Sequence, residues 1–539
     1  MWMVSARIAR NNEKATPVEE RSMMAATNGE KPLELSVRNF GPIAEGRVEL
    51  RPFTVFVGPS NTGKSYLATL IYALHRFFGF YYGRDKNTIL PGGAFPAQYL
   101  KQSAQRTGLS SDSVASILEW TAEGYHAWGE GGSEYQEFSA KELPTPVLTL
   151  VRAAVTDADH WSAPLSDQLV RCFGMVCLDN LIRNGNGSKA GFAVRGSVRN
   201  GERHRPSYEC KVAIHEGVKI NAMVEDVLPL QNSQWFPPHF ATPWTILHGM
   251  ESSSDEEKEA VAAQLLAAYS NVFVSDSVGP LSQPAHYLLT SRANLMHTHQ
   301  TIVQSLIAGA SQPTIAPTFS GLLGDFLERI VGLGNQRNQR EASEYPLALD
   351  LERNVVGGEI RIASNPVGYP EFLYRPYGWE RDLPLANTSS MVSELAPVVL
   401  YLRHVVQPGD TLIIEEPESH LHPAMQVEFT RLLAAAVKAG IRIIITTHSE
   451  WVLEELANLV LMSELPVERR EGFEGADLAL SPEELGVWSF QPTEDGSVVE
   501  ELRFDEEAGK FPSDAGLVTV ELYNRFARIA NRIERLKED

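Results

Sequence analysis

The sequence predicts an α/β fold with a central mixed or parallel sheet, and three short apolar runs carry this prediction. The runs lie at residues 53–57, 411–415 and 441–447, and each has the length and composition of a buried strand. Each run ends in a polar turn, and helical patterns follow at residues 65–75 and 450–462. Parallel strands of this kind place their carboxyl ends, and the polar residues after them, at one edge of the sheet.

The turn after the first run has the sequence of a phosphate-binding loop, G-x-x-x-x-G-K-S. Gly58 and Gly63 let the backbone N–H groups face a phosphate where a Cβ would obstruct the approach. Lys64 neutralises the β and γ oxygens, and Ser65 offers a hydroxyl to Mg²⁺. The alternative, a glycine turn with a stray lysine, does not account for a strand before the loop and a helix after it. The sequence therefore predicts a P-loop nucleoside triphosphatase (P-loop NTPase) fold that binds ATP and Mg²⁺, with nucleotide ligands Gly58, Pro59, Ser60, Asn61, Thr62, Gly63, Lys64 and Ser65.

Two carboxylates end the second predicted strand. Residues 411–418 read TLIIEEPE, so Glu415 lies where the strand emerges and Glu416 lies in the turn after it. This is the Walker B pattern, in which Glu415 holds the water shell of Mg²⁺ and Glu416 orients or deprotonates the attacking water. A strand followed by an ordinary acidic turn is the alternative. The phosphate loop elsewhere in the chain disfavours that alternative.

A histidine follows the third predicted strand. His448 comes directly after residues 441–447, at the sheet edge where ligands collect, so it is a candidate sensor of the γ-phosphate or of the attacking water. A structural histidine is the alternative. The candidate catalytic residues are therefore Lys64, Glu416 and His448, and the candidate ligands of Mg²⁺ are Ser65 and Glu415.

Small hydroxyl residues open a helix upstream of the acidic strand. Ser389 and Ser390 precede the apolar residues 395–403. Serines in this position are good N-caps of a helix. The same free N–H groups are able to bind a phosphate instead.

Together these patches resemble the ATP-binding-cassette ATPases of the non-transporter kind, the RecF and structural-maintenance-of-chromosomes (SMC) branch. The greatest similarity is to the overcoming-lysogenization-defect (OLD) group and its stand-alone ATPases. The similar patches are residues 35–43, the phosphate loop, the signature-like segment 387–394, the block 415–423 and residues 446–449. The resemblance implies a head-to-tail dimer or a higher oligomer. In such an assembly each copy offers Ser389 or Ser390 to the triphosphate of the other.

The resemblance also draws attention to an arginine. Similar proteins carry a tyrosine–leucine strand that ends at an arginine, and residues 285–292 fit this description. Arg292 is therefore a candidate phosphate sensor, since the transferred phosphoryl group needs a cation beyond Lys64. An arginine that caps the strand through a salt bridge is the alternative.

Some positions depart from the family pattern. Met391 follows Ser390 where the family signature has glycine, and Glu415 stands where many members have aspartate. No glutamine loop stands out among Gln98, Gln231 and Gln234. In the OLD nucleases a Toprim nuclease begins after the core, whereas no E-G…D-x-D arrangement follows here. We therefore expect a stand-alone ATPase whose effector, such as a nuclease, is a separate partner.

The predicted core is discontinuous. The expected divisions are a disordered leader (1–32), an ATPase core (33–83 and 285–462), an inserted lobe (84–284) and a C-terminal segment (463–539). The inserted lobe is expected to be large and mostly helical. Alternating apolar and polar residues at 190–224 predict a small antiparallel sheet within it. The C-terminal segment is expected to contain a hairpin at 487–504 and a final helix at 518–537.

Composition narrows the class of protein. The 539 residues are 43% hydrophobic and 21% charged, enough for two or three packed domains. Three cysteines without paired spacing predict buried thiols in a reducing compartment. No run approaches the roughly 18 apolar residues of a membrane span, so we expect a cytoplasmic protein without membrane contact. A formal net charge of −21 opposes nonspecific binding of nucleic acid. DNA contact stays open at one basic group, Arg195, Arg199, Arg203, His204 and Arg205.

The leading hypothesis is an ATP-binding and ATP-hydrolysing switch of the OLD/RecF-like type, which dimerises around nucleotide and gates a partner effector. The resemblance makes DNA repair or anti-phage defence the expected setting. Two alternatives stay open. One is an ATP-dependent scaffold that holds an inhibited partner with little turnover, and the other is an ATPase that processes DNA directly.

Overall fold

The computed structural model describes most of the predicted core and parts of the remainder. The described residues are 33–79, 110–128, 135–138, 149, 158–183, 190–200, 203–214, 218–224, 254–255, 257–259, 262, 278–290, 292–310, 320–333, 346–364, 370–512 and 523–530. The expected leader at 1–32 and the three candidate glutamines, Gln98, Gln231 and Gln234, lie outside these residues.

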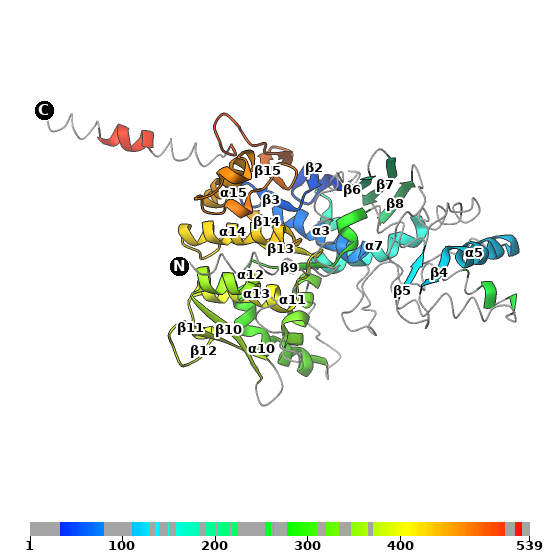
Figure 1. Ribbon diagram of the computed structural model, residues 1–539, viewed down its shortest axis with the longest axis horizontal. Helices are drawn as coiled ribbons and strands as arrows, with labels where there is room; N and C mark the ends of the chain where they lie inside the picture. Colours follow the sequence, from blue (N-terminus) through cyan, green and yellow to red (C-terminus); the bar gives the residue numbers. More distant parts are fainter. Residues whose placement is uncertain are drawn as a thin grey trace.

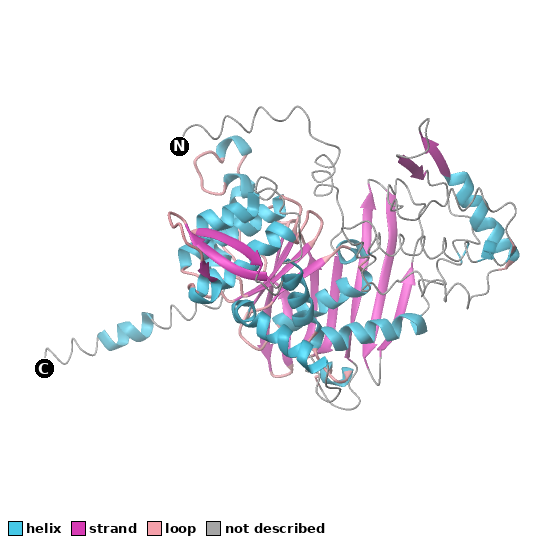
Figure 2. Cartoon of the chain, turned by 90° about the horizontal axis from the view of Figure 1, so that it is seen from below, coloured by secondary structure: helices cyan, strands magenta, loops and turns pink. Residues whose placement is uncertain are grey.

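One large mixed sheet organises the described residues, and Figure 2 shows its strands side by side. The strand order is β8-β7-β6-β1-β2-β16-β15-β3-β14-β13-β9. The strands are β1 (Leu33–Phe40), β2 (Ile43–Leu50), β3 (Phe53–Val57), β6 (Ala190–Asn200), β7 (Arg203–Ile214), β8 (Val218–Val224), β9 (Ala285–Leu288), β13 (Thr411–Glu415), β14 (Arg442–Thr447), β15 (Leu485–Thr493) and β16 (Gly496–Glu501). The predicted α/β fold with a central sheet is confirmed.

The three strands predicted from apolar runs are neighbours in the parallel part of this sheet. β14 lies between β3 and β13 and pairs in parallel with both. β9 continues the parallel block beyond β13, and β15 continues it beyond β3. Strands buried on both faces carry continuous apolar runs, which is why Ile443, Ile444 and Ile445 follow one another in β14. The carboxyl ends of β3, β13 and β14 therefore meet at one edge.

Helices cover both faces of the parallel block (Figure 1). The longer helices are α3 (Lys64–Phe78), α5 (Ser111–Gly124), α7 (Ala158–Phe173), α10 (Arg292–Ala310), α11 (Gly321–Gly332), α13 (Ser390–His404), α14 (Pro423–Lys438) and α15 (Glu450–Glu464), with a short α12 (Pro346–Leu351). Phe56 of β3 packs in the hydrophobic cluster that contains α3 and α7. Its neighbour Val55 packs in the second cluster, with α13, α14 and α15. Alternate residues of the strand thus anchor helices on opposite faces.

Two small sheets accompany the large one. β10 (Gly358–Ser364), β11 (Pro370–Pro376) and β12 (Leu383–Pro384) form an antiparallel sheet beside α10 and α13 (Figure 1). β4 (Tyr125–Trp128) and β5 (Tyr135–Phe138) form a two-stranded sheet after α5.

Residues 190–224 differ from the expectation of a separate small sheet in an inserted lobe. They do form antiparallel strands, β6 to β8, as predicted. β6, however, pairs with β1 and so extends the main sheet, with Leu35 opposite Val194. Without β6 this side of β1 would be an edge of unpaired N–H and C=O groups. Pairing between strands so far apart in sequence leaves no local signal.

The C-terminal hairpin is also more central than expected. β15 and β16 confirm the hairpin predicted at 487–504. β15 pairs with β3, the strand before the phosphate loop, and β16 pairs with β2. Residues from the expected C-terminal segment therefore complete the core sheet. Beyond them, residues 523–530 are helical, within the predicted final helix.

Three further properties concern the described part of the chain. No helix there is both long and apolar enough to cross a membrane. No three side chains of His, Cys, Asp or Glu gather there as a metal cluster. The cysteines are free thiols, with Cys172 and Cys210 buried, but the prediction of a buried thiol is wrong for Cys177, which is exposed.

Candidate nucleotide-binding site

The phosphate loop joins β3 to α3 and adopts the backbone conformation that its glycines permit. Gly58 has a φ of 139° and Gly63 has a φ of 101°, both in a region that disfavours side chains. A Cβ at Gly58 would lie 2.6 Å from the carbonyl oxygen of Phe490 in β15, and one at Gly63 would lie 2.7 Å from Cγ1 of Ile43. The two glycines are thus required by packing against β15 and β2 as well as by backbone conformation.

Lys64 is the first residue of α3 and is buried beneath the loop. Its Nζ donates hydrogen bonds to the carbonyl oxygens of Gly58, at 2.7 Å, and of Pro59, at 2.6 Å. Burial lowers the pKa of Lys64 to about 8, although Glu416 and Glu418 oppose this shift. The ammonium is therefore held in a dry position by neutral carbonyls and faces two carboxylates. Phosphate oxygens are stronger partners for an ammonium than carbonyls are.

The other residues of the phosphate loop are either buried in the protein or exposed to solvent. Thr62 is buried and its hydroxyl donates to the carbonyl oxygen of Pro59 at 2.8 Å. The exposed residues are Pro59, Ser60, Asn61 and Ser65. An exposed hydroxyl at Ser65, directly after the buried ammonium, is accessible to a cation that arrives with a triphosphate.

Glu415 ends β13 with its carboxylate almost fully buried. One carboxylate oxygen accepts a 2.8 Å hydrogen bond from the Tyr287 hydroxyl of β9. The other accepts from the backbone N–H of Thr290, at 3.2 Å, and from its hydroxyl, at 2.9 Å. Tyr287 also receives a hydrogen bond from Thr69 of α3. Glu415 thus ties β13 to β9 and, through Tyr287, to the helix after the phosphate loop.

Glu416 and His448 face each other at the carboxyl ends of β13 and β14. His448 Nε2 lies 3.7 Å from Glu416 Oε1, and each side chain is about one-third exposed. Glu416 has a φ of 42°, and its N–H donates to the carbonyl oxygen of Thr446 at 2.9 Å. Burial and then Lys64 lower the pKa of His448, against the opposing effect of Glu416 and Glu418. The two candidate catalytic groups therefore lie close together, and both interact electrostatically with Lys64.

A third acidic residue, Glu418, was not selected from the sequence. Its Oε1 accepts from the Thr447 hydroxyl at 2.8 Å and from the His448 N–H at 2.7 Å. Its Oε2 is buried without a hydrogen-bond partner among the described residues. The only signal in the sequence is a carboxylate two positions after Glu416, which is common in turns. Contact with the end of β14 is what makes this residue part of the site.

Arg292 begins α10, beyond the end of β9, and is fully buried. Its guanidinium donates to the carbonyl oxygens of Glu394, at 2.9 Å, and of Glu415, at 2.8 Å. Its Nε also lies 3.1 Å from the Glu394 carboxylate of α13. All these partners are protein groups, and the side chain offers no surface to a phosphate in this conformation. The geometry favours the salt-bridge alternative for Arg292 over a direct phosphate contact.

The two signature-like serines lie at the start of α13. Ser389 is the N-cap, and its hydroxyl accepts from the N–H of Val392 at 3.4 Å. Ser390 is the first helical residue, and both serines are exposed. The capping role is thus present, and the exposed N-terminus of α13 leaves the serines accessible to another molecule.

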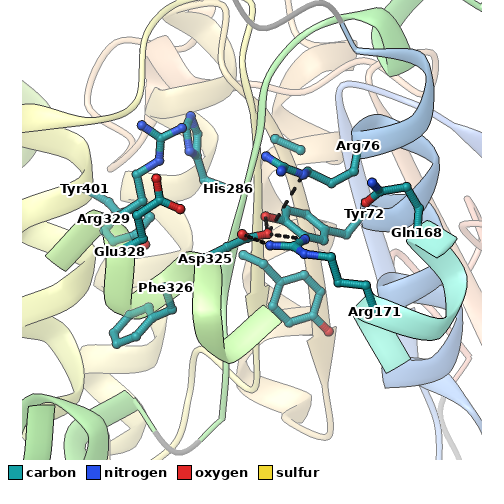
Figure 3. A pocket seen from close by; sticks show the side chains of 12 residues that line it. Tyr72, Arg76, Gln168, Arg171, His286, Asp325, Phe326, Glu328, Arg329 and Tyr401 are labelled. Carbon is teal, nitrogen blue, oxygen red and sulfur yellow. Dashed lines mark hydrogen bonds and ion pairs between the residues drawn. The ribbon is translucent and has the colours of Figure 1, made fainter. Parts of the chain in front are cut away.

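A cavity of about 260 Å³ lies at the other end of α3 (Figure 3). It is lined by Tyr72, Arg76, Gln168, Arg171, Ala285, His286, Tyr287, Asp325, Phe326, Glu328, Arg329 and Tyr401. Tyr72 and Arg76 follow Lys64 by 8 and 12 residues, so they lie roughly 12 to 18 Å from it along the helix axis. Asp325 is the centre of its polar contacts and accepts from Tyr72 at 2.7 Å and from Arg171 at 3.0 Å. This cavity is therefore separate from the phosphate loop.

The residues at the phosphate loop fit a hard divalent cation. Ser65 offers an exposed hydroxyl, and Glu416 and Glu418 offer carboxylates whose charge acts on Lys64. Mg²⁺ prefers oxygen ligands of this kind and retains several waters. The buried, unpartnered Oε2 of Glu418 is an acceptor that such a water would satisfy. Glu415, by contrast, already accepts three hydrogen bonds.

Comparison with known proteins agrees with the class of protein that the phosphate loop indicates, an ATPase. Residues 310–453 match the family model of the AAA ATPase domain, a range that contains the N-terminus of α13, the acidic turn and His448. The phosphate loop lies outside this range, so the two observations are separate. They support ATP use in general. A comparison with curated proteins gives no match.

Several solved structures are similar to this chain at a low level. An SMC head bound to the C-terminal winged-helix domain of ScpA has a TM-score of 0.37 and 10% identity, covering 88% of this chain and 98% of that one. An SMC head domain from Thermotoga maritima has a TM-score of 0.31 and 11% identity, covering 88% and 99%. An Smc head with an extended coiled coil from Pyrococcus furiosus, bound to the C-terminal domain of ScpA, has a TM-score of 0.36 and 11% identity, covering 88% and 96%. Similarity at this level carries no functional argument.

Proposed function

We propose that this protein is an ATP-hydrolysing switch of the OLD/RecF-like type. One observation supports the proposal: Lys64, Glu416 and His448 follow three neighbouring strands, β3, β13 and β14, and interact with one another. Glu416 and His448 lie 3.7 Å apart. The charge of Glu416 raises the pKa of Lys64, and the charge of Lys64 lowers the pKa of His448. Phosphoryl transfer requires charge neutralisation, which the lysine of the phosphate loop supplies. It also requires activation of the attacking water, which the acidic turn and the histidine at the strand end supply.

Each residue then has a distinct role. Lys64 leaves the carbonyls of Gly58 and Pro59 and binds the β and γ oxygens of ATP. Glu416 accepts a proton from the attacking water or orients it, and the partly exposed His448 beside it binds the γ-phosphate or the same water. Bound Mg²⁺ would supply charge neutralisation at the phosphates. Ser65 and Glu415 are the ligands expected from the sequence, and of the two Glu415 is already hydrogen-bonded to Tyr287 and Thr290.

Arg292 stabilises this site from the protein interior. Its buried guanidinium holds the backbone of Glu415 and pairs with Glu394 of α13. We propose that this link transmits the position of α13 to the acidic turn, which corresponds to the salt-bridge alternative and not to the candidate phosphate sensor. The exposed serines stand at the start of the same helix.

Self-association completes the site in this proposal. Two copies arranged head to tail present Ser389 or Ser390 of one copy to the triphosphate of the other, and the exposure of both serines supports this. The assembly then gates a separate effector, such as a nuclease, in DNA repair or anti-phage defence. Direct DNA processing has weaker support, because Arg195 of the basic group is already paired with Glu34 and Glu209.

Turnover tests the proposal directly. The purified protein with ATP and Mg²⁺ is expected to release phosphate. Lys64→Ala and Glu416→Gln are expected to lower the rate by about 10² to 10⁴, the effect of losing a general base or an equivalent group. Glu428→Gln, a partly exposed carboxylate of α14, is the matched control and should keep the wild-type rate. ATP binding without turnover in the wild type would replace this proposal by the scaffold alternative, and salt-sensitive DNA binding that grows with ATP would support direct DNA processing.

Mixing two inactive variants tests the shared site. Lys64→Ala spoils the loop of its own copy, and Ser390→Arg spoils the serine that is offered to the other copy. A mixed dimer contains one site with an intact loop and an intact serine, so mixing is expected to restore activity that neither variant has alone. If the mixture stays inactive while wild-type and variant chains associate by mass measurement, the head-to-tail arrangement is wrong.

A further inference from the structure

Glu418 carries a buried carboxylate oxygen that no described group satisfies. Oε1 has two hydrogen bonds, from the Thr447 hydroxyl and the His448 N–H, while Oε2 has none and is sealed from solvent. An unsatisfied buried polar atom destabilises the folded protein, and more so when it is charged. Folded proteins keep few such atoms, and those that persist often serve a ligand or an ion.

The position of this oxygen points to the kind of group that would satisfy it. Oε1 of Glu418 accepts from the N–H of His448, so the carboxylate lies beside the candidate catalytic histidine, and its charge raises the pKa of both Lys64 and His448. A carboxylate oxygen accepts hydrogen bonds only, so phosphate oxygens cannot satisfy it. A hydrogen-bond donor is needed, and the waters on Mg²⁺ are donors that would enter with the nucleotide.

Comparison with Glu415 strengthens this reading. The sequence pattern selects Glu415 for the water shell of Mg²⁺, but its two oxygens already accept from Tyr287 and Thr290. Glu418 lies three residues further along, and one of its oxygens is uncommitted. Of the two carboxylates, only Glu418 has an oxygen that accepts no hydrogen bond from the described residues.

We propose that Glu418 is a positioning residue with two tasks. One oxygen fixes the main chain at His448, and the other accepts a hydrogen bond from the water shell of Mg²⁺ that enters with ATP. This inference rests on the proposed nucleotide site but not on turnover. It differs from a purely structural lock between the acidic turn and β14, which would use Oε1 alone.

Two substitutions separate the tasks. In Glu418→Gln the amide oxygen still accepts from Thr447 and His448, while an NH₂ group that donates replaces the uncommitted acceptor. In Glu418→Ala both functions are lost. Glu428→Gln, the control used above, removes a carboxylate far from Lys64 on α14.

Nucleotide affinity with and without metal is the measurement. The affinity of each variant for a non-hydrolysable ATP analogue is compared in Mg²⁺ and in EDTA, and Mn²⁺ binding in the presence of the analogue is followed by electron paramagnetic resonance. Glu418→Gln is expected to keep or raise the affinity in EDTA, because a negative charge near the phosphates is removed. Its gain in affinity from Mg²⁺ is expected to fall by about 10-fold or more, the usual effect of losing an outer-shell partner of a metal.

Each remaining outcome supports or overturns one of the two tasks of Glu418. If Mg²⁺ raises the nucleotide affinity of Glu418→Gln as much as it raises that of the wild type, the metal-facing role is overturned. This holds whether or not the wild type hydrolyses ATP. Lower kcat in Glu418→Ala than in Glu418→Gln, at similar KM, supports the hold on His448, and equal kcat in the two variants contradicts it. Binding of metal and nucleotide without turnover in the wild type would end the proposed ATPase function but leave the role of Glu418 in place. If Glu418→Ala does not fold, Glu418→Gln alone decides the metal-facing role.

Discussion

The two ends of α3 differ in how fully the buried carboxylates beside them are paired. At its start, the phosphate loop has strained backbone angles, Lys64 is a buried ammonium with a lowered pKa, and Glu418 has an oxygen without a partner. At its far end, Asp325 accepts from Tyr72 and Arg171 and pairs with Arg76, as Figure 3 shows. Burial opposes ionisation of Asp325, but these donors outweigh it and hold its pKa below the usual value.

This difference separates binding from stability. The contacts of Asp325 fix α3, α7 and α11 against one another, and all of its partners are protein side chains. The loop end keeps a buried ammonium and an unsatisfied carboxylate oxygen, which cost stability in the nucleotide-free protein. In the function proposed above, a bound triphosphate and metal would relieve this cost. We therefore expect substitutions at the two ends to change stability in opposite directions.

The largest effect is expected at the far end. Asp325→Ala removes the partner of two buried or half-buried arginines and should lower the free energy of unfolding by about 3 kcal/mol, because uncompensated charges remain. Denaturant unfolding measures this change. The affinity for ATP in the folded fraction should stay within a few-fold of the wild type.

Glu428→Ala is the control for this substitution. It removes a partly exposed partner of Arg431, so the expected change is about 0.5 kcal/mol or less. A large loss of ATP affinity in Asp325→Ala, with stability unchanged, would remove the distinction between the two ends.

A second prediction concerns acid stability at the far end. His75 is fully buried, lies 3.0 Å through Nδ1 from the carbonyl oxygen of Gln283, and has its pKa lowered by burial from 6.5 to about 4. Between pH 6.5 and 4 the unfolded chain binds a proton here that the native protein does not. Stability is therefore lost as the pH falls through this window, by about 2 kcal/mol at pH 5.

His75→Gln removes this titration. The difference in melting temperature between pH 7 and pH 5 should be smaller for this variant than for the wild type. His422→Asn, at an exposed N-cap of α14, should keep the wild-type pH dependence. An unchanged pH dependence in His75→Gln would show that His75 is already charged or exposed in the native protein.

The smallest effect is expected at the loop end and has the opposite sign. Lys64→Met removes a buried charge and should raise the stability of the nucleotide-free protein by about 1 kcal/mol at pH 7, while it abolishes ATP binding. Because the pKa of Lys64 is lowered to about 8, the unfolded chain binds more protons than the native one between pH 8 and 10.5. The wild type should therefore recover stability as the pH rises above 8, and the advantage of the variant should shrink.

Melting temperatures at pH 7 and pH 9.5, without nucleotide, check this prediction. Lys438→Met, which removes a surface lysine paired with Glu484, is the control and should not raise stability at either pH. A lower melting temperature for Lys64→Met at pH 7 would mean that the bonds to Gly58 and Pro59 outweigh the cost of burying the charge.

Local sequence patterns were sufficient for the parts of the site that follow strands. The predicted strands at 53–57 and 411–415 coincide with β3 and β13, and the third prediction differs from β14 by one residue. Buried parallel strands carry apolar runs, and their polar ends share an edge, so Lys64, Glu416 and His448 could be grouped before any coordinates. Glu418, Tyr287 and Thr290 could not be found in this way, because their roles depend on hydrogen bonds between different strands and turns.

The sequence by itself determined the phosphate loop, the acidic turn and the strand-end histidine, since each depends on a few consecutive residues and on the burial of one strand. Only the tertiary structure decided the order of the strands, the burial of Arg292 beneath Glu415 and the packing of Phe490 against Gly58. β15 pairs with β3 across more than 400 residues of chain. Such pairing is selected by the burial of whole faces of the sheet and by the need to pair every strand edge, and neither requirement leaves a mark in a short stretch of sequence.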